Sequence, residues 1–249
     1  MNLILLDKKE LDTNGLTVLS DRRAKHICEV IKPSVGDHLN AGIINGKVGQ
    51  VEVLDFNLGS SPNISLQVIN DSLTESSPPA LDISLIISLP RPKVARRLIA
   101  LCTECGVKDI HFINSYRVEK SFWQSPLLNK DKVHQQIQLS LEQSKDTQLP
   151  SIQFHNRFKP FVEDELPAMA KNKQALVAHP YNADIYLDSS TNSLDARKQQ
   201  SRLIAIGPEG GFIPYEIELL QKAGLKTIGL GSRIYRVETV VPLLLGKFS

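Results

Sequence analysis

The chain has 249 residues, of which 41% are hydrophobic and 22% charged, and a net charge of +2, so it is an ordinary globular chain with a buried core. This composition excludes a disordered, collagen-like or disulfide-framed protein, and the length suits one large domain or two small ones. The apolar runs fall far short of the ~20 residues of a membrane-spanning helix. Because the N-terminus lacks the basic segment of a secretory signal, we expect a cytoplasmic protein without membrane contact.

Short strands and one helix are predicted in the first part of the chain. The strands are expected at residues 3–6, 36–44, 48–56 and 64–69. Asn45-Gly46, between two of these runs, is a strong hairpin signal. Asp21 is a suitable N-cap for a helix that extends to Ile31. We therefore expect a small β-barrel-like domain over residues 1–70.

A Ser-, Pro- and acid-rich stretch over residues 71–80 has the composition of a linker. Strands and helices alternate after it. Strands are expected at 81–89, 107–113, 174–178, 203–206 and 227–230, and helices at 92–106, 132–143 and 214–224. This alternation predicts an α/β domain with a mostly parallel sheet over residues 81–249. Ligands of such sheets bind outside the carboxyl ends of the strands.

Three cysteines, an odd number, indicate reduced thiols rather than disulfides. Cys102 and Cys105 form a C-x-x-C pair, which is also found in zinc and redox sites. No second pair stands at ligand spacing, and the two thiols lie three residues apart on one face of a predicted helix. We therefore expect both thiols to pack in the core and no metal to be bound.

Positive charge is unevenly distributed along the chain. Residues 1–80 carry a net charge of −3 and residues 81–249 a net charge of +5. The cationic clusters are Arg22, Arg23, Lys25 and His26 in the first part and Arg91, Lys93, Arg96 and Arg97 in the second. Such clusters are typical both of solvated helix faces and of surfaces that bind polyanions, and the sequence alone leaves both interpretations open.

Two loops that follow predicted strands carry the strongest functional signals. The first, Gly207-Pro208-Glu209-Gly210-Gly211-Phe212, lets the backbone approach a ligand closely, although it matches neither nucleotide-binding fingerprint. The second brings Arg233 and Arg236 beside a strand end. An ion pair of Arg236 with Glu238 at a helix start is the structural alternative. Together the two loops predict a ligand site.

These two loops, Gly207–Phe212 and Leu230–Thr239, closely resemble the 16S ribosomal RNA uridine N3-methyltransferase family of the SPOUT superfamily. Further segments resemble elements of the same family in the same order, so the resemblance covers nearly the whole chain. These segments are Arg23–Ile31, Thr103–Val107, Glu142–Ser144 and Leu149-Pro150.

The resemblance implies a PUA-like RNA-binding β-barrel domain over 1–70, a linker over 71–80 and a trefoil-knotted methyltransferase domain over 81–249. It implies S-adenosylmethionine as the methyl donor and a uridine of small-subunit ribosomal RNA as the acceptor. It also implies a homodimer through the knot domain, for which an apolar face is available that equally fits ordinary core packing. That face consists of Val237, Val240, Val241, Leu244 and Leu245.

The resemblance further implies the residues of the site. Donor contacts are expected at Ala178, His179, Pro180, Gly207, Pro208, Glu209, Gly210, Gly211, Leu230, Gly231, Ile234, Tyr235 and Arg236. Arg233 and Arg236 are the expected catalytic cations, because a guanidinium stabilises the anion that a uridine forms as N3 loses its proton. RNA phosphates are expected on the two cationic clusters. No proton acceptor stands out, because Glu209 and Glu238 are better suited to orient neighbouring groups.

Some positions depart from the family pattern. Tyr235, Val237 and Val240 replace a leucine, a threonine and an alanine, and Lys145-Asp146 stands where the family has an arginine. A divergent paralogue that methylates another RNA position, and an RNA-binding protein without catalysis, therefore remain alternatives. A small-molecule α/β enzyme whose cationic clusters are solvated faces is a third.

Overall fold

A computed structural model describes residues 1–59, 61–70, 72–181, 183–187 and 200–248, and the contacts divide the chain into two compact units. Unit 1 contains Met1–Pro79 together with Ile137–Leu149. Unit 2 contains Ala80–Gln136 and Pro150–Ser249. The sequence places residues 137–149 in the second domain, but their contacts assign them to unit 1. Among the described residues, no helix is long and apolar enough to cross a membrane.

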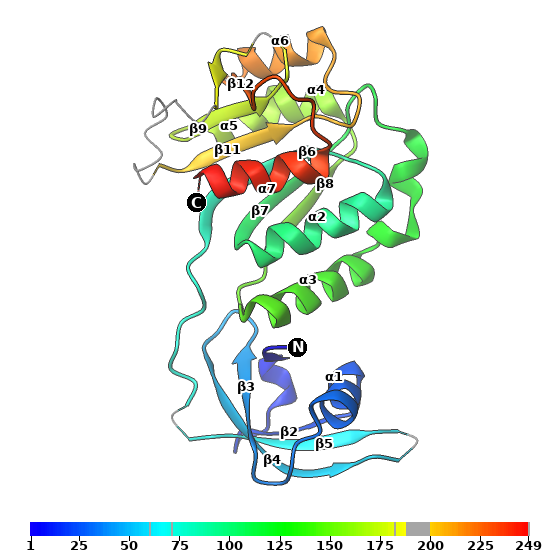
Figure 1. Ribbon diagram of the computed structural model, residues 1–249, viewed down its shortest axis with the longest axis vertical. Coiled ribbons are helices and arrows are strands. Elements are labelled where there is room, and N and C mark those ends of the chain that lie inside the picture. The colour runs from blue at the N-terminus through cyan, green and yellow to red at the C-terminus, as the bar shows by residue number, and fades with distance from the viewer. Residues whose placement is uncertain (60, 71, 182, 188–199, 249) are drawn as a thin grey trace. The chain divides into compact units, whose positions relative to one another are not determined.

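Unit 1 contains a curled, mixed five-stranded sheet in the order β1-β3-β4-β5-β2 (Figure 1). Its strands are β1 (Ile4–Leu6), β2 (Leu16–Leu19), β3 (His38–Ile43), β4 (Val48–Asn57) and β5 (Asn63–Val68). β1 and β3 are parallel and the other neighbours antiparallel. The Asn45-Gly46 hairpin is confirmed: it joins β3 to β4, and Asn45 adopts a φ of 55°, which asparagine tolerates in tight turns.

The helical part of unit 1 consists of η1 (Lys8–Glu10), α1 (Arg22–His26) and the π-helical η2 (Ile27–Ile31). The predicted N-cap is confirmed, because the Asp21 side chain accepts a hydrogen bond from the Arg23 amide. Ala24 and Ile27 are fully buried and pack into the apolar core formed by the sheet. The sequence pattern missed β2, a strand of only four residues.

Unit 2 is built on a seven-stranded parallel sheet in the order β10-β12-β9-β11-β6-β7-β8. Its strands are β6 (Leu81–Ser88), β7 (Val107–Ile113), β8 (Ser151–His155), β9 (Gln174–Ala178), β10 (Ile185–Tyr186), β11 (Arg202–Ile206) and β12 (Lys226–Gly229). The predicted parallel sheet is therefore confirmed. The sequence pattern missed β8, which lies at one edge of the sheet and keeps partly exposed residues.

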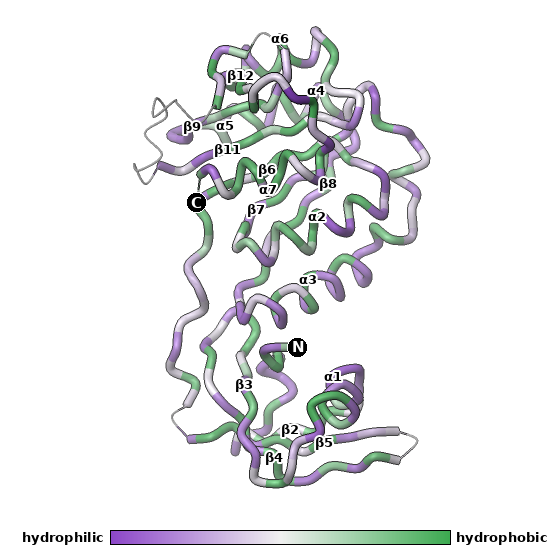
Figure 2. Tube along the Cα trace, viewed as in Figure 1, coloured by the Kyte–Doolittle hydropathy of each residue, from purple (hydrophilic) through white to green (hydrophobic). Residues whose placement is uncertain are grey.

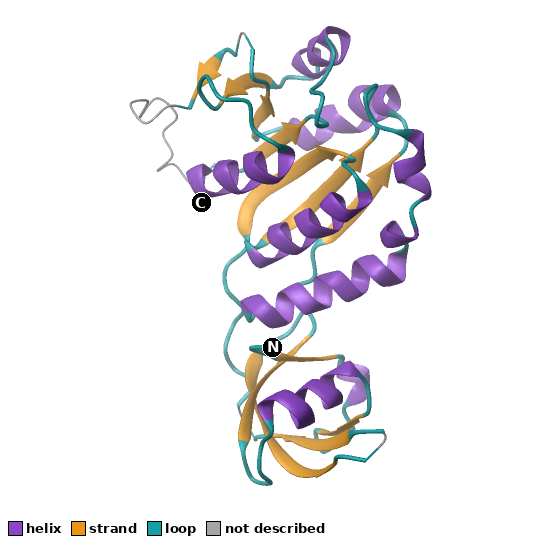
Figure 3. Ribbon diagram, turned by 45° about the vertical axis from the view of Figure 1, so that its right-hand side comes forward, coloured by secondary structure: helices purple, strands orange, loops and turns teal. Residues whose placement is uncertain are grey.

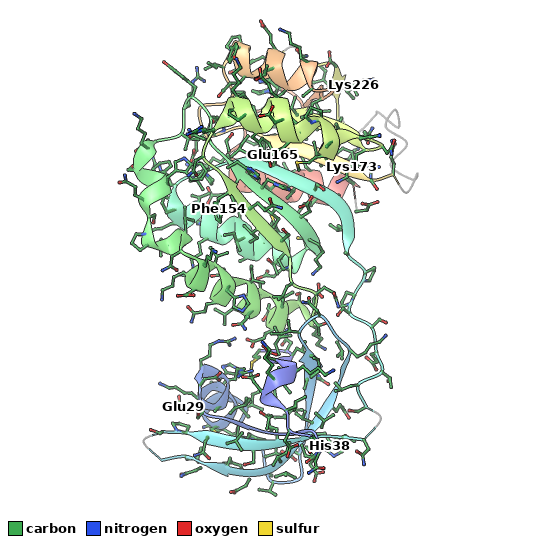
Figure 4. The ribbon with its side chains drawn as sticks, turned by 180° about the vertical axis from the view of Figure 1, so that it is seen from behind. Glu29, His38, Phe154, Glu165, Lys173 and Lys226 are labelled. Atoms are coloured by element: carbon green, nitrogen blue, oxygen red, sulfur yellow. The ribbon has the colours of Figure 1, made fainter. Side chains whose placement is uncertain are left out.

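Helices cover both faces of this sheet (Figures 1 and 4). The α-helices are α2 (Pro92–Glu104), α3 (Lys130–Ser144), α4 (Phe158–Pro160), α5 (Leu166–Ala170), α6 (Pro214–Lys222) and α7 (Val237–Phe248), and the remaining helical segments are η3 (Lys120–Gln124), η4 (Pro126–Leu128) and η5 (Phe161–Glu165). α2 and α7 lie on one face, and the α4–α5 segment lies on the other. The central strands are strongly hydrophobic (Figure 2), as expected for a sheet covered on both sides.

The structure corrects one expectation about α2 and decides between the two interpretations of the apolar face of α7. Cys102 packs in the core as expected, but Cys105 is exposed because it forms the C-cap where α2 ends. The apolar face of α7 is not free for a partner. Val237, Val241, Leu244 and Leu245 are buried within unit 2, so this face is part of the core.

Candidate functional site

A pocket of about 650 Å³ lies where the loops after β9, β11 and β12 meet. We call it the strand-end pocket. These loops follow the carboxyl ends of parallel strands, the edge at which α/β sheets bind ligands (Figure 3). The pocket is lined by Arg117, Ala178, His179, Pro180, Tyr181, Ile206, Gly207, Pro208, Glu209, Gly210, Gly211, Phe212, Pro214, Ile217, Glu218, Gln221, Thr227, Ile228, Leu230, Arg233, Ile234, Tyr235, Val237 and Val240.

The 207–212 loop contributes one wall. It leaves β11 at buried Ile206 and leads into α6 at Pro214, a residue type that favours the first turn of a helix. Gly211 has a φ of +75°, which a residue with a side chain rarely adopts. In the described part of the chain, no heavy atom lies within 4 Å of the place where a Cβ would stand on Gly211. A ligand can therefore approach the backbone of this loop closely.

Glu216 fixes the entrance to α6. Its carboxylate accepts hydrogen bonds from the Ile213 amide, at 3.0 Å, and from the Tyr116 amide, at 2.7 Å. Only 3% of Glu216 is exposed, so the carboxylate is a buried structural acceptor that joins two loops.

Arg117 adds a residue that the sequence reasoning missed. It belongs to the loop after β7, and its guanidinium donates a hydrogen bond to the Gly210 carbonyl. It lines the pocket together with the three loops that the sequence indicated. The signal was present in part, because Arg117 follows a predicted strand of the same parallel sheet. The reach of its side chain to Gly210 depends on the order of the strands.

The 230–236 loop contributes a further part of the lining. Leu230, Arg233, Ile234 and Tyr235 line the pocket, whereas Gly231 and Arg236 do not. Arg236 is exposed, and its carbonyl accepts the amides of Thr239 and Val240 at the start of α7. The structure thus brings only one of the two expected catalytic arginines, Arg233, to the pocket.

Glu238 pairs with Arg97 rather than with Arg236. This contact joins α7 to α2. It corrects the alternative in which Arg236 and Glu238 form the ion pair, and it engages one member of the second cationic cluster.

The loop after β9 places His179 in the pocket. Its amide donates to the Ile228 carbonyl at 2.9 Å, and its ring lies edge-on to Tyr181 with centroids 5.9 Å apart. Burial lowers the pKa of His179 below the ordinary histidine value. The imidazole is therefore neutral at neutral pH and able to accept a proton.

The first cationic cluster is largely structural. Arg22 forms a two-pronged ion pair with Glu142, with N–O distances of 2.7 and 2.8 Å. Arg23 is 9% exposed, and its guanidinium contacts Asp21, Glu10 and the Leu5 carbonyl. The expectation that Arg23 holds RNA phosphates is therefore corrected, because its donors are used inside unit 1.

The remaining members of the two cationic clusters differ in their exposure and in their hydrogen-bond partners. Lys25 is exposed, whereas His26 is half-buried with its Nε2 3.5 Å from the N-terminal amine. In unit 2, Arg91 and Lys93 are exposed, and Arg96 donates to Gln136. Lys25, Arg91 and Lys93 are thus the members best placed to meet a ligand from solvent. Within the described ranges, no group of three or more His, Cys, Asp or Glu side chains is arranged to hold a metal ion.

Comparison with known proteins gives a consistent result. The family model described as RNA methyltransferase domain matches residues 77–249. The ribosomal RNA small subunit methyltransferase E of Treponema pallidum is 28% identical over 242 residues, which cover 96% of this chain and 87% of that protein. The ribosomal RNA small subunit methyltransferase E 1 of Borreliella burgdorferi is 24% identical over 241 residues, which cover 96% of this chain and 93% of that protein.

Solved structures share the fold over nearly the full length of the chain. A ribosomal RNA small subunit methyltransferase E from Neisseria gonorrhoeae, bound to S-adenosylmethionine, matches with a TM-score of 0.74 and 18% identity, covering 99% of this chain and 95% of that one. A Legionella pneumophila protein solved with its bound cofactor matches with a TM-score of 0.73 and 20% identity, covering 99% and 96%. The predicted α/β fold class is confirmed: a curled mixed sheet is followed along the chain by a seven-stranded parallel sheet, and these solved structures share the fold.

Proposed function

Because the chain belongs to the RNA methyltransferase family, we propose that it methylates N3 of a uridine in small-subunit ribosomal RNA, with S-adenosylmethionine as donor. The observation that carries the proposal is the strand-end pocket, formed by the glycine-rich 207–212 loop and the two neighbouring strand-end loops. The names of the full-length bacterial relatives support the small ribosomal subunit as the source of the RNA.

The residues of the pocket fit this donor. Leu230, Ile234 and Tyr235 line the pocket without being buried and offer apolar surface for a flat adenine ring. Open space beside Gly211 leaves its backbone accessible to the polar groups of a ligand. The carboxylates of Glu209 and Glu218 also line the pocket, and negative charge favours a sulfonium cation.

When bound, S-adenosylmethionine supplies an electrophilic methyl group on a positively charged sulfur. In the overall reaction the carbon–sulfur bond breaks with its electron pair on sulfur, a carbon–N3 bond forms, and N3 loses its proton. The pocket contributes by orienting the reactants and excluding water. Arg233, which lines the pocket, stabilises the negative charge that the base acquires.

His179 is the residue we assign to the N3 proton. It is the single histidine among the described residues that line the pocket. Burial lowers its pKa, so the ring is neutral at neutral pH. A neutral imidazole accepts a proton, whereas the guanidinium of Arg233 does not.

RNA is held in unit 1 by Lys25 and in unit 2 by Arg91 and Lys93, whose exposed charges attract phosphates. The proposal includes a homodimer formed by unit 2. Leu243 on α7 is 45% exposed and offers apolar surface for it. Light scattering of the purified full chain tests this part of the proposal, and a monomer at micromolar concentration contradicts it.

The function is tested by methyl transfer. The purified chain is given labelled S-adenosylmethionine with small subunits, large subunits or bulk RNA from cells that lack the gene, and the labelled nucleoside is identified by mass. We expect label in small-subunit RNA as N3-methyluridine. Label in another nucleoside or in large subunits overturns the assigned position and substrate, and no label on any RNA overturns the activity.

A further inference from the structure

The loop after β7 carries two neighbouring residues, Tyr116 and Arg117, and the second of them lines the strand-end pocket. Arg117 is exposed and lines the pocket. Tyr116, its neighbour, is 78% exposed. Neither residue belongs to the loops after β9, β11 and β12 that enclose the rest of the pocket.

The guanidinium of Arg117 is only partly used by the protein. One of its nitrogens donates to the Gly210 carbonyl. No carboxylate in the described part of the chain forms an ion pair with it. A guanidinium has five N–H groups in a fixed plane, so Arg117 keeps donors for a ligand while the bond to Gly210 restrains its position.

The backbone of Tyr116 is fixed, although its ring is free. The amide donates to the Glu216 carboxylate at 2.7 Å, and Glu216 is 3% exposed. The loop is therefore anchored to the start of α6 by a buried, charge-assisted hydrogen bond. A solvent-exposed aromatic ring carried on an anchored backbone suits the stacking of unpaired RNA bases.

We infer that Tyr116 and Arg117 form the subsite for the acceptor base, and this inference rests on the proposed function. The occupant is an unpaired uracil in RNA. Arg117 donates to a carbonyl oxygen next to N3, and Tyr116 stacks on the base or on its neighbour. The carbonyl oxygens of uracil share the negative charge once N3 has lost its proton, so a guanidinium at this edge binds the reacting form of the base more tightly.

The test separates contact with the base from support of the 207–212 loop. Steady-state transfer to small subunits gives kcat and KM for RNA, and equilibrium dialysis without RNA gives the affinity for S-adenosylmethionine. Arg117→Ala is expected to lower kcat/KM at least about 30-fold while donor affinity changes less than about threefold. Arg117→Lys recovers little, because a point charge lacks the planar fork.

Tyr116→Ala is expected to raise the KM for RNA about five- to tenfold, in line with the loss of one stacked base, and Tyr116→Phe recovers most of this loss. Arg157→Ala is the matched control. Arg157 is an exposed arginine just after β8 that does not line the pocket, and it provides no side-chain cap to α4.

The outcomes are distinguishable. Unchanged kcat/KM in Arg117→Ala overturns the inference and leaves the proposed function standing. A loss of transfer that is matched by an equal loss of donor affinity shows that Arg117 only supports the 207–212 loop, and also overturns it. If the unaltered protein transfers methyl groups to no RNA, the proposed function fails, and the acceptor subsite fails with it.

Discussion

His111 Nδ1 lies 2.9 Å from His155 Nε2, and the two rings stack with their centroids 5.2 Å apart on neighbouring strands β7 and β8. His111 Nε2 is 3.0 Å from Asp109 Oδ1, and His155 Nδ1 is 3.4 Å from Glu165 Oε1. Glu165 is labelled in Figure 4. Two neutral rings supply two N–H groups for these three contacts. One of the three contacts therefore lacks a proton when both rings are neutral.

The first prediction concerns the pH dependence of stability. Burial lowers the pKa of His155, an effect that the neighbouring His111 reinforces and Glu165 opposes. The unfolded chain therefore takes up a proton at this residue at higher pH than the folded chain. Stability is expected to fall as pH falls through the ordinary histidine value of about 6.5. Thermal unfolding between about pH 8 and pH 5 measures this slope.

His155→Gln removes the titrating group and should make the slope shallower. His134→Gln, on the exposed side of α3, serves as the control and should keep the slope of the unaltered protein. An unchanged slope in His155→Gln contradicts the prediction, because the pH dependence then comes from other groups.

The second prediction separates structural from RNA-binding cations. Arg23→Met removes the buried donor to the Leu5 carbonyl and to the partly exposed carboxylates of Glu10 and Asp21, which is expected to cost about 1 to 3 kcal/mol of unfolding free energy. Lys25→Ala changes an exposed residue of the same helix and is expected to alter stability by less than about 0.5 kcal/mol.

Denaturant unfolding and RNA affinity are measured for both variants. Lys25→Ala should weaken RNA binding and reduce its salt dependence. If Arg23→Met keeps full stability, the assignment of Arg23 to the interior of unit 1 is wrong.

The third prediction concerns thiol reactivity. Cys102 is buried and its pKa is raised by that burial, whereas Cys105 is exposed at the end of α2. The thiolate is the reactive form, so an alkylating reagent should modify Cys105 in the native protein and leave Cys102 unmodified. Partial burial and Glu104 raise the pKa of Cys105, so even this reaction is expected to be slower than that of a free thiol. Peptide mapping by mass detects the modified residue, and equal labelling of both sites contradicts the prediction.

The fourth prediction tests the contact between Gly210 and Arg117. A Cβ on Gly210 would lie 2.8 Å from Arg117 Cδ, closer than real side chains approach, so Gly210→Ala displaces the arginine. We expect kcat/KM to fall about as far as in Arg117→Ala, and the double variant to fall little further, because both changes remove the same interaction.

Gly246→Ala is the matched control, since no described heavy atom lies within 4 Å of a Cβ at Gly246 in α7. Full additivity of Gly210→Ala and Arg117→Ala in the double variant shows that the two residues act independently, against this prediction.

The fifth prediction concerns residues 137–149. In the full chain Ile137, Leu141 and Glu142 are buried, and Glu142 is paired with Arg22. A truncated chain that begins at Ala80 lacks the rest of unit 1 and leaves the buried Glu142 carboxylate without its partner. We expect limited proteolysis to cut this truncated chain within 137–149 and to spare that segment in the full chain. Equal protection of both chains contradicts the prediction.

The local signals in the sequence predicted much of the fold because they act between near neighbours. Asp21 caps α1 through its own side chain, and Asn45-Gly46 forms a turn from two adjacent residues. The long apolar runs of β6 and β11 indicated buried strands for the same reason. β2 and β8 were missed because one is very short and the other lies at a sheet edge, where the apolar signal is weak.

The candidate site was predictable only in part. The loops after β11 and β12 could be identified because glycines and arginines follow recognisable strands, and the loop after β9 was expected from the family resemblance. The contact of Arg117 with Gly210 joins residues 93 positions apart, and the bond of Tyr116 to Glu216 joins residues 100 apart. Such contacts depend on the order of strands in the sheet. The burial of Arg23 likewise depends on how Glu10 and Leu5 fold around it.

Unit 1 consists of two stretches of sequence that the ribosome synthesises at different times. Residues 1–79 leave the ribosome first, but Glu142, the partner of Arg22, follows 120 positions after Arg22. Unit 1 is therefore complete only after the first strands of unit 2 have been synthesised. Contacts between distant parts of a chain form slowly, and incomplete domains expose apolar surface. Early termination of synthesis before residue 137 thus leaves an N-terminal fragment in which Arg22 has no Glu142 to pair with.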